Sequence, residues 1–580
     1  MTAIGALEQA RHVFLHGCGL PEAWADQPQW RILESGFDAG LNFLATWHAW
    51  RTDAQRPRLL HYASTASDPV AFADLLRAAS TYPALQPLAE ALAAQWQGLT
   101  PGFHRFSFEQ GRVLLTLCVG DTAAMLRELS FRADSVFLGS EPAEVKALTR
   151  LARRGATLAT PLREDELLHD LKSAGWQVAP RAGLAPSRSA TAARLAPPWQ
   201  VKVLDDESDL VPADCVVIGA GLAGAAAAAS LARRGWRVQV IDAAATPATG
   251  ASNLPAGLLA PHQSPDDNLL SRLSRSGVRI TLAEAQRLAA GIEWERTGVL
   301  EWRGDDARAL PALGEALQPW SREATPAQKR AAGLPEETTA WWHDNAAWIE
   351  PAALVRAWLR EPGVRFAGGR QAARLLREGE RWLVQDAGGQ LLAQAALVVV
   401  AAALDSAPLL QGRIQLHPVR GQLTWGPHGD DARTLPPFPV NGHGHFLPRV
   451  PLVERGAWIT GSTYGRGDAD ASLRREDTDA NLQRVREVMP QAAQVMQGSI
   501  DRREIRSWSG VRCASSDRRP LVGEVEAGLW VSTAMGSRGL TFAALCGELI
   551  AARLHAEPWP LEARLAQALD VSRQFRARPG

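Results

Sequence analysis

The sequence predicts a protein of two α/β lobes, and three observations support this fold class. Residues 215–242 read as a strand, a glycine-rich turn, a helix and a second strand. The first 175 or so residues alternate apolar strands with helical stretches. Between them, residues 179–198 lose apolar periodicity and become rich in Pro, Ala, Arg and Ser, which is typical of a linker.

The expected domains are therefore 1–178, a linker at 179–212, and 213–580. In the last of these, nucleotide-binding parts at about 213–290 and 500–560 enclose a substrate domain with its own mixed sheet, which adds an α+β part to the α/β fold. A chain of 580 residues is too long for a single core, in agreement with this division.

The composition is that of an ordinary globular protein, with 46% hydrophobic and 21% charged residues. Basic and acidic residues are equal at 62 each, so a nucleic-acid partner would have to be held by local basic patches. The five cysteines are scattered without CxxC spacing, which argues against a disulfide framework or a metal site and favours a reducing compartment. The start lacks a signal-peptide pattern, and the apolar run 395–404 is far shorter than the roughly 20 residues of a membrane span. We therefore expect a cytoplasmic protein that binds neither membrane nor metal.

The N-terminal lobe begins with a strand at Trp30–Leu33, a turn from Glu34 to Gly40, and a helix from Leu41 to Trp50. An acid followed by a glycine-rich turn into a helix has the shape of an S-adenosylmethionine loop, in which backbone passes close to the ligand. Any strand-to-helix connection of a doubly wound sheet can look the same, and the pattern alone leaves both interpretations open. The candidate ligand residues here are Glu34, Gly36 and Gly40.

The other strands expected in this lobe follow the same alternation, at Arg58–His61, Arg112–Val119, Ser135–Leu138 and Thr157–Thr160. Such alternation predicts a mostly parallel sheet with ligands at the carboxyl ends of its strands. Asp121 follows one of these ends and is a fourth candidate for S-adenosylmethionine.

The C-terminal lobe is organised around a strand at Cys215–Ile218, the turn Gly219–Gly224, an alanine-rich helix and a strand at Val238–Ile241. In a dinucleotide site, Gly219 allows the tight turn, Gly221 lets backbone approach a pyrophosphate, and Gly224 lets the helix pack on the strand. The pyrophosphate lies at the helix N-terminus, where free N–H groups and the helix dipole favour negative charge. Asp242 would accept hydrogen bonds from a ribose.

Further along this lobe, the small residues of 249–259, which include Ala251 and Ser252, would permit close approach to a flat ring system. Helices are expected at Asp267–Leu288 and Pro351–Leu359 and strands at Arg381–Val384 and Leu392–Val400, where Ala396–Val400 returns the chain to the nucleotide sheet.

A second glycine-rich turn follows the expected strand Leu529–Thr533 and opens a helix at Phe542–Ala552. Its positive helix terminus could face the pyrimidine end of a flavin, where reduction places negative charge. The candidate contacts are Gly536, Arg538, Gly539 and Leu540. Arg538 could instead only stabilise the turn through its backbone.

Together these residues resemble the family of bifunctional tRNA 5-methylaminomethyl-2-thiouridine biosynthesis proteins, and the likeness covers nearly the whole chain. The stretches that carry it are 40–47, 219–224, 249–259, 266–268, 418–422, 461–468, 511–514 and 536–540. The C-terminal lobe of that family belongs with flavoproteins similar to glycine oxidase and D-amino-acid oxidase.

The resemblance implies two successive reactions on a modified wobble uridine of tRNA. An FAD-dependent lobe removes the carboxymethyl group of 5-carboxymethylaminomethyl-(2-thio)uridine, and an S-adenosylmethionine-dependent lobe then methylates the exposed amine. It also implies that Arg512 binds the substrate carboxylate, because a bidentate guanidinium supplies both charge and orientation. A surface ion pair is the alternative role for Arg512. A two-lobed monomer suffices for this chemistry.

The N-terminal lobe departs from the family pattern at three places. Asp38 stands where the family has glycine, no acid is evident at 61–64 after the second strand, and 138–142 replaces an Asp-Gly-Phe-Ala-Pro stretch with its long loop. The loop aspartate has no counterpart unless Glu141 substitutes for it. These departures predict an active FAD lobe beside a methyltransferase lobe that has lost activity, because a site rather than a fold carries function.

Two other functions remain open from the sequence. One is a free-amine oxidase acting on glycine or sarcosine, which would use the same Arg512 and flavin. The other is a tRNA-binding scaffold whose flavin is structural.

Overall fold

The computed structural model describes residues 3–139, 144–185, 188–199, 210–303, 310–314 and 317–575. The chain divides into two compact units. Unit 1 consists of residues 1–211 and 551–566, and unit 2 of residues 212–550 and 567–580. The predicted combination of α/β lobes with an inserted mixed sheet is confirmed.

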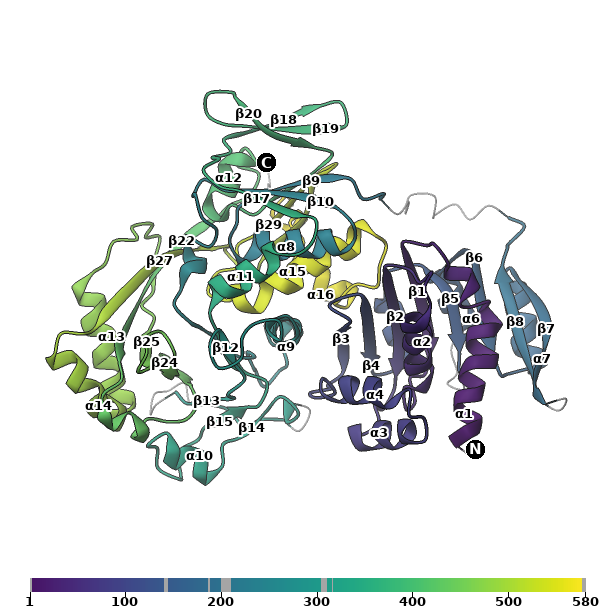
Figure 1. The fold of residues 1–580 in the computed structure, drawn as a ribbon, viewed down its shortest axis with the longest axis horizontal. Coiled ribbons are helices and arrows are strands. Elements are labelled where there is room, and N and C mark those ends of the chain that lie inside the picture. The colour runs from purple at the N-terminus through teal and green to yellow at the C-terminus, as the bar shows by residue number, and fades with distance from the viewer. Residues whose placement is uncertain are drawn as a thin grey trace. The chain divides into compact units, whose positions relative to one another are not determined.

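Unit 1 is built on an eight-stranded sheet in the order β3-β4-β2-β1-β5-β6-β8-β7 (Figure 1). Strands β4, β2, β1, β5 and β6 are parallel, while β3, β7 and β8 pair antiparallel with their neighbours. The strands are β1 (Gln29–Ser35), β2 (Leu59–Ala66), β3 (Gly102–Phe108), β4 (Val113–Val119), β5 (Ala133–Leu138), β6 (Ala152–Thr160), β7 (Trp176–Ala185) and β8 (Arg188–Leu195).

Helices cover both faces of this sheet, because successive side chains of a strand point to opposite sides. On β1, Ile32 joins one buried cluster with α2, and Leu33 joins another with α5. The helices of unit 1 are α1 (Ala3–Gln9), α2 (Leu41–Thr52), α3 (Phe72–Ser80), α4 (Gln86–Ala93), α5 (Thr122–Glu128), α6 (Val145–Arg150) and α7 (Asp165–Ser173).

The predicted linker at 179–212 begins too early. Residues 176–185 and 188–195 form the paired strands β7 and β8 at the edge of the sheet, and β8 pairs with β6. The strand was missed because the buried residues of β8 include the small Ala190 and Ala193 and the polar Thr191, which do not give a clear apolar alternation.

The C-terminal lobe was predicted as one continuous stretch, 213–580, but residues 551–566 belong to unit 1 and unit 2 resumes at residue 567. Gln29 Nε2 donates a hydrogen bond to the His555 carbonyl at 3.0 Å, and Arg31 Nη1 donates to the carbonyls of His555 and Ala556, each at 3.2 Å. The donors lie at the start of β1, far from the acceptors in sequence, so local pattern could not reveal the contact.

Unit 2 contains a six-stranded sheet in the order β17-β10-β9-β21-β29-β28, which is parallel except for β28. Its strands are β9 (Asp214–Ile218), β10 (Arg237–Ile241), β17 (Val364–Ala367), β21 (Leu397–Val400), β28 (Leu521–Glu526) and β29 (Leu529–Thr533). The predicted return of the chain to this sheet at Ala396–Val400 is therefore confirmed. The expected strand Leu392–Val400 is however two strands, because β20 pairs in a different sheet.

Helices pack on one face of this sheet, and a small second sheet packs on the other. On one face lie α8 (Leu222–Arg233), α11 (Pro351–Leu359) and α15 (Gly539–Leu554), with α8 beside α15 (Figure 1). On the other, Val216 and Ile218 pack in one cluster with Trp382 and Val384 of the hairpin sheet β18–β20. That small sheet comprises β18 (Arg374–Glu378), β19 (Arg381–Gln385) and β20 (Leu391–Ala395).

The inserted part of unit 2 carries a larger mixed sheet in the order β14-β15-β13-β23-β24-β25-β22-β26, with β27 also pairing β22. These strands are β13 (Val299–Glu301), β14 (Ser321–Glu323), β15 (Trp341–His343), β22 (His417–Pro427), β23 (Val440–Gly442), β24 (Gly444–Val450), β25 (Ala457–Gly461), β26 (Gly465–Arg466) and β27 (Arg506–Ala514). A three-stranded sheet is formed by β11 (Gly257–Leu259), β12 (Trp294–Glu295) and β16 (Ala347–Ile349). The remaining helices are α9 (Leu269–Ala285), α10 (Pro326–Ala331), α12 (Ser406–Leu409), α13 (Arg475–Val488), α14 (Pro490–Asp501), α16 (Ala563–Gln567) and α17 (Ser572–Phe575).

Within the described residues, no helix is both long enough and apolar enough to cross a bilayer. The five cysteines all lie within the described residues, where they are buried and form no disulfide bond. The described part of the chain also holds no group of three or more His, Cys, Asp or Glu side chains placed to bind a metal ion.

Candidate functional site

The turn between β9 and α8 leaves no room for side chains. Gly219 has φ +109°, and a Cβ added there would lie 2.4 Å from the Ala401 carbonyl oxygen. A Cβ at Gly224 would lie 1.8 Å from the Gly219 carbonyl oxygen, and one at Gly221 would lie 3.1 Å from Ser252 Oγ. Backbone thus packs directly on backbone, and Gly221 presents bare main chain at the start of α8.

Polar groups gather around this turn. Asp242, at the end of β10, accepts hydrogen bonds from the backbone N–H of Ala220 at 2.7 Å and of Ala244 at 2.8 Å. Ser252 Oγ accepts one from the N–H of Leu222 at 3.0 Å, and exposed Ala251 lies beside it in a short 3₁₀ turn. A carboxylate and the N–H groups of a helix N-terminus therefore face one turn, as a dinucleotide requires.

The second predicted turn lies against the first. Gly536 has φ +57°, and its N–H donates to the Cys513 carbonyl at 2.8 Å. A Cβ at Gly539 would lie 3.1 Å from a methyl carbon of Leu222 at the start of α8. The Leu540 carbonyl accepts a hydrogen bond from Thr281 Oγ1 at 2.7 Å. The N-termini of α8 and α15 are thereby brought side by side.

Arg512, on β27, has its guanidinium lying across Gly421 of β22. A Cβ at Gly421 would lie 2.4 Å from both terminal nitrogens of Arg512. Arg512 Nη2 donates a hydrogen bond to Ser462 Oγ at 2.5 Å. Within the described residues no carboxylate pairs with this half-buried guanidinium, so the surface ion pair is not formed, and burial lowers its pKa. A sheltered cation without a counter-charge is suited to bind an anion.

Tyr464 connects Arg512 to the second glycine turn. The guanidinium carbon of Arg512 lies 4.7 Å from the centre of the Tyr464 ring, and the Tyr464 hydroxyl donates to Ser537 Oγ at 2.7 Å. Ser537 lies between Gly536 and Arg538. Burial lowers the pKa of Arg538, and within the described residues its side chain pairs with no carboxylate either. The backbone N–H of Arg538 donates to the Met535 carbonyl at 3.1 Å, and its carbonyl accepts from the Phe542 N–H at 2.9 Å; the contact with flavin stays a prediction.

The predicted ligand residues of unit 1 lie at the carboxyl ends of β1 and β4, which flank β2 in the sheet. Gly36 has φ +88°, and its N–H donates to Thr65 Oγ1 at 3.2 Å. Gly40 has φ +72°, and a Cβ there would lie 2.8 Å from the Phe37 ring. Asp121 follows β4 and caps α5 by accepting a hydrogen bond from the Ala124 N–H at 2.8 Å.

Glu34 differs from these residues because its carboxylate is buried and already paired. One oxygen accepts a hydrogen bond from Asn42 Nδ2 and the other from Ser64 Oγ, both at 2.8 Å. Burial raises the pKa of Glu34 to about 7, although these hydrogen bonds oppose the shift.

Comparisons with known proteins also divide the chain into a methyltransferase part and an FAD-dependent part. A family model described as FAD dependent oxidoreductase matches residues 214–553, and one described as S-adenosyl-L-methionine-dependent methyltransferase matches residues 83–196. The chain is 50% identical over 603 residues to the tRNA 5-methylaminomethyl-2-thiouridine biosynthesis bifunctional protein MnmC of Polaromonas sp. (strain JS666), covering 97% of this chain and 94% of the relative. It is 47% identical to the protein of that name from Delftia acidovorans, covering 100% of this chain and 96% of the relative. This chain belongs to that family.

Solved structures show the same fold for the FAD lobe. L-proline dehydrogenase from P. horikoshii superposes with a TM-score of 0.52 at 18% identity, covering 64% of this chain and 99% of that structure. Glycine oxidase from Geobacillus kaustophilus gives a TM-score of 0.50 at 19% identity, covering 64% and 100%. At this identity the likeness concerns the fold alone.

The family implies FAD and S-adenosylmethionine, and the two sites suit these cofactors differently. In unit 2, the cradle at Gly219, Gly221 and Gly224, the carboxylate of Asp242 and the paired helix N-termini fit a dinucleotide. In unit 1, the glycines and Asp121 follow β1 and β4 at the sheet edge where parallel sheets bind ligands, but β2 ends in Thr65 and Ala66, without an acid for a ribose.

The two other departures also have structural counterparts. Asp38 adopts a left-handed conformation with φ +46°, which glycine takes without strain. Gly139 packs on β1, where its N–H donates to Ser35 Oγ at 3.1 Å and an added Cβ would lie 2.4 Å from the Ser35 carbonyl oxygen. Glu141 lies outside the described residues. The predicted loss of methyl transfer stays a prediction.

Three residues of the site in unit 2 escaped sequence reasoning. Gly421 and Tyr464 lie within the matched stretches 418–422 and 461–468, but only the fold shows that both touch Arg512. His445, on β24, has a pKa lowered to about 4 by burial and by the charges of Arg512 and Arg484, so it is neutral at pH 7. No spacing in the sequence links these positions, because separate strands and a loop supply them.

Proposed function

We propose that unit 2 of this protein oxidatively removes the carboxymethyl group of 5-carboxymethylaminomethyl-(2-thio)uridine in tRNA. Unit 1 then supplies the S-adenosylmethionine-dependent methylation of the 5-aminomethyl product. The observation that carries the first step is the guanidinium of Arg512, which has no carboxylate partner among the described residues. It lies across Gly421 and is joined through Tyr464 to the turn at Gly536. The protein acts in the cytoplasm and as a monomer in this proposal.

The substrate side chain is an N-substituted glycine, a secondary amine that bears a CH2-carboxylate. Arg512 binds this carboxylate with two parallel hydrogen bonds, which fixes the direction of the neighbouring CH2 group. FAD held at the turns Gly219–Gly224 and Gly536–Leu540 would supply the acceptor for a hydride from that carbon. The resulting imine adds water and separates into the 5-aminomethyl uridine and glyoxylate, so that two electrons leave with the cofactor and the oxygen of the aldehyde comes from water.

The other residues of unit 2 hold the cofactor and the cation in this proposal. The pyrophosphate lies against Gly219, Gly221 and Gly224, with Asp242 on the ribose and Ala251 and Ser252 beside the helix start. The flavin end lies at the turn formed by Gly536, Arg538, Gly539 and Leu540. Tyr464 positions Arg512 by packing its ring under the guanidinium.

The methylation step rests on family membership and on the fold of unit 1. Glu34, Gly36, Gly40 and Asp121 are the proposed contacts for S-adenosylmethionine. The three departures in this lobe predict that this second step is slow or lost.

Mass spectrometry of tRNA nucleosides, after incubation of the protein with 5-carboxymethylaminomethyl tRNA, tests both steps. We expect 5-aminomethyl uridine whether or not S-adenosylmethionine is supplied, and bleaching of the flavin by this tRNA under anaerobic conditions. A flavin that stays oxidised would refute the oxidase and leave a scaffold. Faster bleaching by sarcosine than by the tRNA would instead identify a free-amine oxidase. Abundant 5-methylaminomethyl uridine would refute the slow second step.

A further inference from the structure

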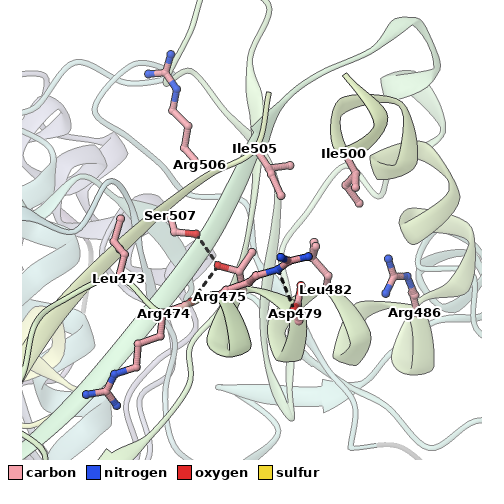
Figure 2. Close-up of a pocket in the computed structure, with 11 residues that line it drawn as sticks. Leu473, Arg474, Arg475, Asp479, Leu482, Arg486, Ile500, Ile505, Arg506 and Ser507 are labelled. Carbon is pink, nitrogen blue, oxygen red and sulfur yellow. Dashed lines mark hydrogen bonds and ion pairs between the residues drawn. The ribbon is translucent and has the colours of Figure 1, made fainter. Parts of the chain in front are cut away.

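An open pocket of about 790 Å³ lies in unit 2, between the start of α13 and the start of β27 (Figure 2). Its lining combines arginines with aliphatic side chains and a single carboxylate. The lining residues are Leu473, Arg474, Arg475, Thr478, Asp479, Leu482, Arg486, Ile500, Ile505, Arg506 and Ser507.

The pocket lining carries more positive than negative charge. Arg474 is neutralised by Asp468 at 2.6 Å and Asp470 at 3.0 Å, outside the pocket. Arg475 is exposed over 93% of its side chain and lies a long 3.8 Å from Asp479, the pocket's one acid. Arg486 and Arg506, both exposed, have no carboxylate partner within the part of the chain that the structure describes. The pocket therefore presents excess positive charge.

The pocket also offers flat and apolar contacts. The guanidinium of Arg506 lies 5.3 Å from the centre of the Trp425 ring, which orients its plane. Leu473 is 61% exposed, and Ile500 and Ile505 are half-buried. Figure 2 shows Arg506 and Arg486 extending from different sides, with the isoleucine side chains between them. Cations around an apolar floor suit a ligand with both phosphates and bases, since bases stack on guanidinium planes and apolar surfaces.

The pocket shares its strands with Arg512. Arg506 and Arg512 lie six residues apart on β27, or roughly 20 Å at a strand rise of about 3.4 Å per residue. Gln422, next to Gly421 on β22, donates from Nε2 to the Arg474 carbonyl at 2.7 Å and to Thr478 Oγ1 at 3.0 Å. Thr478 and Ser507 are themselves joined at 2.9 Å. The pocket wall is thereby fixed to the strand on which the Arg512 guanidinium lies.

We propose that this pocket binds the RNA strand that flanks the modified uridine, with Arg486 and Arg506 on its phosphates. The inference rests on the proposed function, because it assumes that the base at Arg512 belongs to an RNA chain. The overall charge of the protein is zero, so RNA affinity has to come from such local excesses.

Fluorescence anisotropy with an unmodified anticodon stem-loop RNA tests the pocket independently of the chemistry. We expect R486E/R506E to raise Kd at least tenfold, and R486K/R506K to stay within threefold of the wild type because binding to phosphate needs charge. In R486A/R506A, the slope of log affinity against log salt should shrink by about 1.4, since each phosphate neutralised on a single strand contributes roughly 0.7 to that slope. The matched control is R360E, since Arg360 is exposed and unpaired among the described residues at the end of α11.

Two outcomes would overturn the proposal. Either R486E/R506E binds the RNA as tightly as R360E does, or poly-glutamate of equal charge competes as well as RNA. Anaerobic bleaching by 5-carboxymethylaminomethyl tRNA distinguishes failure of the pocket from failure of the proposed function. Bleaching in the wild type with unchanged RNA binding in R486E/R506E refutes the pocket alone, whereas weakened binding without bleaching refutes the oxidase and retains the pocket.

Discussion

The glycine turns Gly219–Gly224 and Gly36–Gly40 each connect a strand to a helix but have different surroundings. Gly219 and Gly224 pack against backbone, and the nearby acid, Asp242, accepts a hydrogen bond from the N–H of Ala220 in the turn itself. At Gly36–Gly40 the acid, Glu34, is buried below the turn and receives the side chains of Asn42 and Ser64. One turn directs its polar groups to where a ligand would lie, and the other directs its carboxylate into the protein.

This difference shows what decides whether a glycine turn is a binding site. The glycines permit a backbone path in both lobes, but the partners of the acid determine whether a ligand meets charge. The cation that would complete the oxidation lies in unit 2, as Arg512.

Gly224→Ala should abolish FAD binding. The added Cβ would meet the Gly219 carbonyl oxygen at 1.8 Å, and backbone on both sides cannot yield without opening the turn. We expect the purified variant to lack the flavin absorbance bands and to bind added FAD at least 100-fold more weakly. Gly388→Ala is the control, because its Cβ makes only an ordinary 3.4 Å contact with Asp386. If Gly224→Ala purified with a full complement of FAD, the assignment of this turn would be wrong.

Gly421→Ala should leave FAD bound but displace the guanidinium of Arg512 from the substrate site. A Cβ there would lie 2.4 Å from the guanidinium nitrogens of Arg512, so the side chain must move away from Ser462 and Tyr464. Two charge-assisted hydrogen bonds to the substrate carboxylate are each worth about 1.5–3 kcal/mol, so flavin reduction by substrate tRNA should slow at least 100-fold. Stopped-flow absorbance measures this rate. Arg512→Lys keeps the charge without the fork and should lie between the variant and the wild type, and a wild-type rate in Gly421→Ala would contradict the role of Arg512.

The sequence predicted the strands that carry both turns of unit 2 because these strands are short apolar runs followed by glycines. Cys215–Ile218 and Leu529–Thr533 were found within one residue of β9 and β29. Sequence reasoning failed where small residues form a strand, as at Ala190 and Ala193 of β8, and where distant segments meet, as at Arg31 and His555. The partners of Arg512 were missed for the second reason, since Gly421, Ser462 and Tyr464 come from other strands and loops.

Glu34→Gln should change how the stability of unit 1 depends on pH. The pKa of Glu34 is raised in the folded state to about 7 from an ordinary value of 4.5, so the folded state holds this proton through that window while the unfolded state loses it. The contribution of this group to the free energy of unfolding is therefore full below pH 4.5, falls as pH rises to 7, and is lost above pH 7. The total loss is about 3 kcal/mol. The fall in melting temperature of unit 1 between about pH 5 and pH 8 should be smaller in Glu34→Gln, while Glu90→Gln, at an exposed site, should match the wild type. Identical pH profiles in all three proteins would show that Glu34 is ionised in a solvated site.

S-adenosylmethionine should stabilise the wild-type protein against thermal unfolding only slightly. A ligand that binds only the folded state stabilises it by RT ln(1 + [L]/Kd), which is about 0.4 kcal/mol when its concentration equals Kd. Since Glu34 is engaged with Asn42 and Ser64 and β2 ends without an acid, we expect about 1 mM S-adenosylmethionine to raise the melting temperature of unit 1 by less than about 1 °C. FAD added to protein stripped of its flavin should raise that of unit 2 by several degrees. Ala66→Glu restores a carboxylate at the end of β2 and should increase the response to S-adenosylmethionine, whereas Ala91→Glu, on the half-buried side of α4, should not. If S-adenosylmethionine raised the melting temperature of the wild type as much as FAD does, the turn Gly36–Gly40 would form a competent ligand site. The two lobes would then not differ in the way described above.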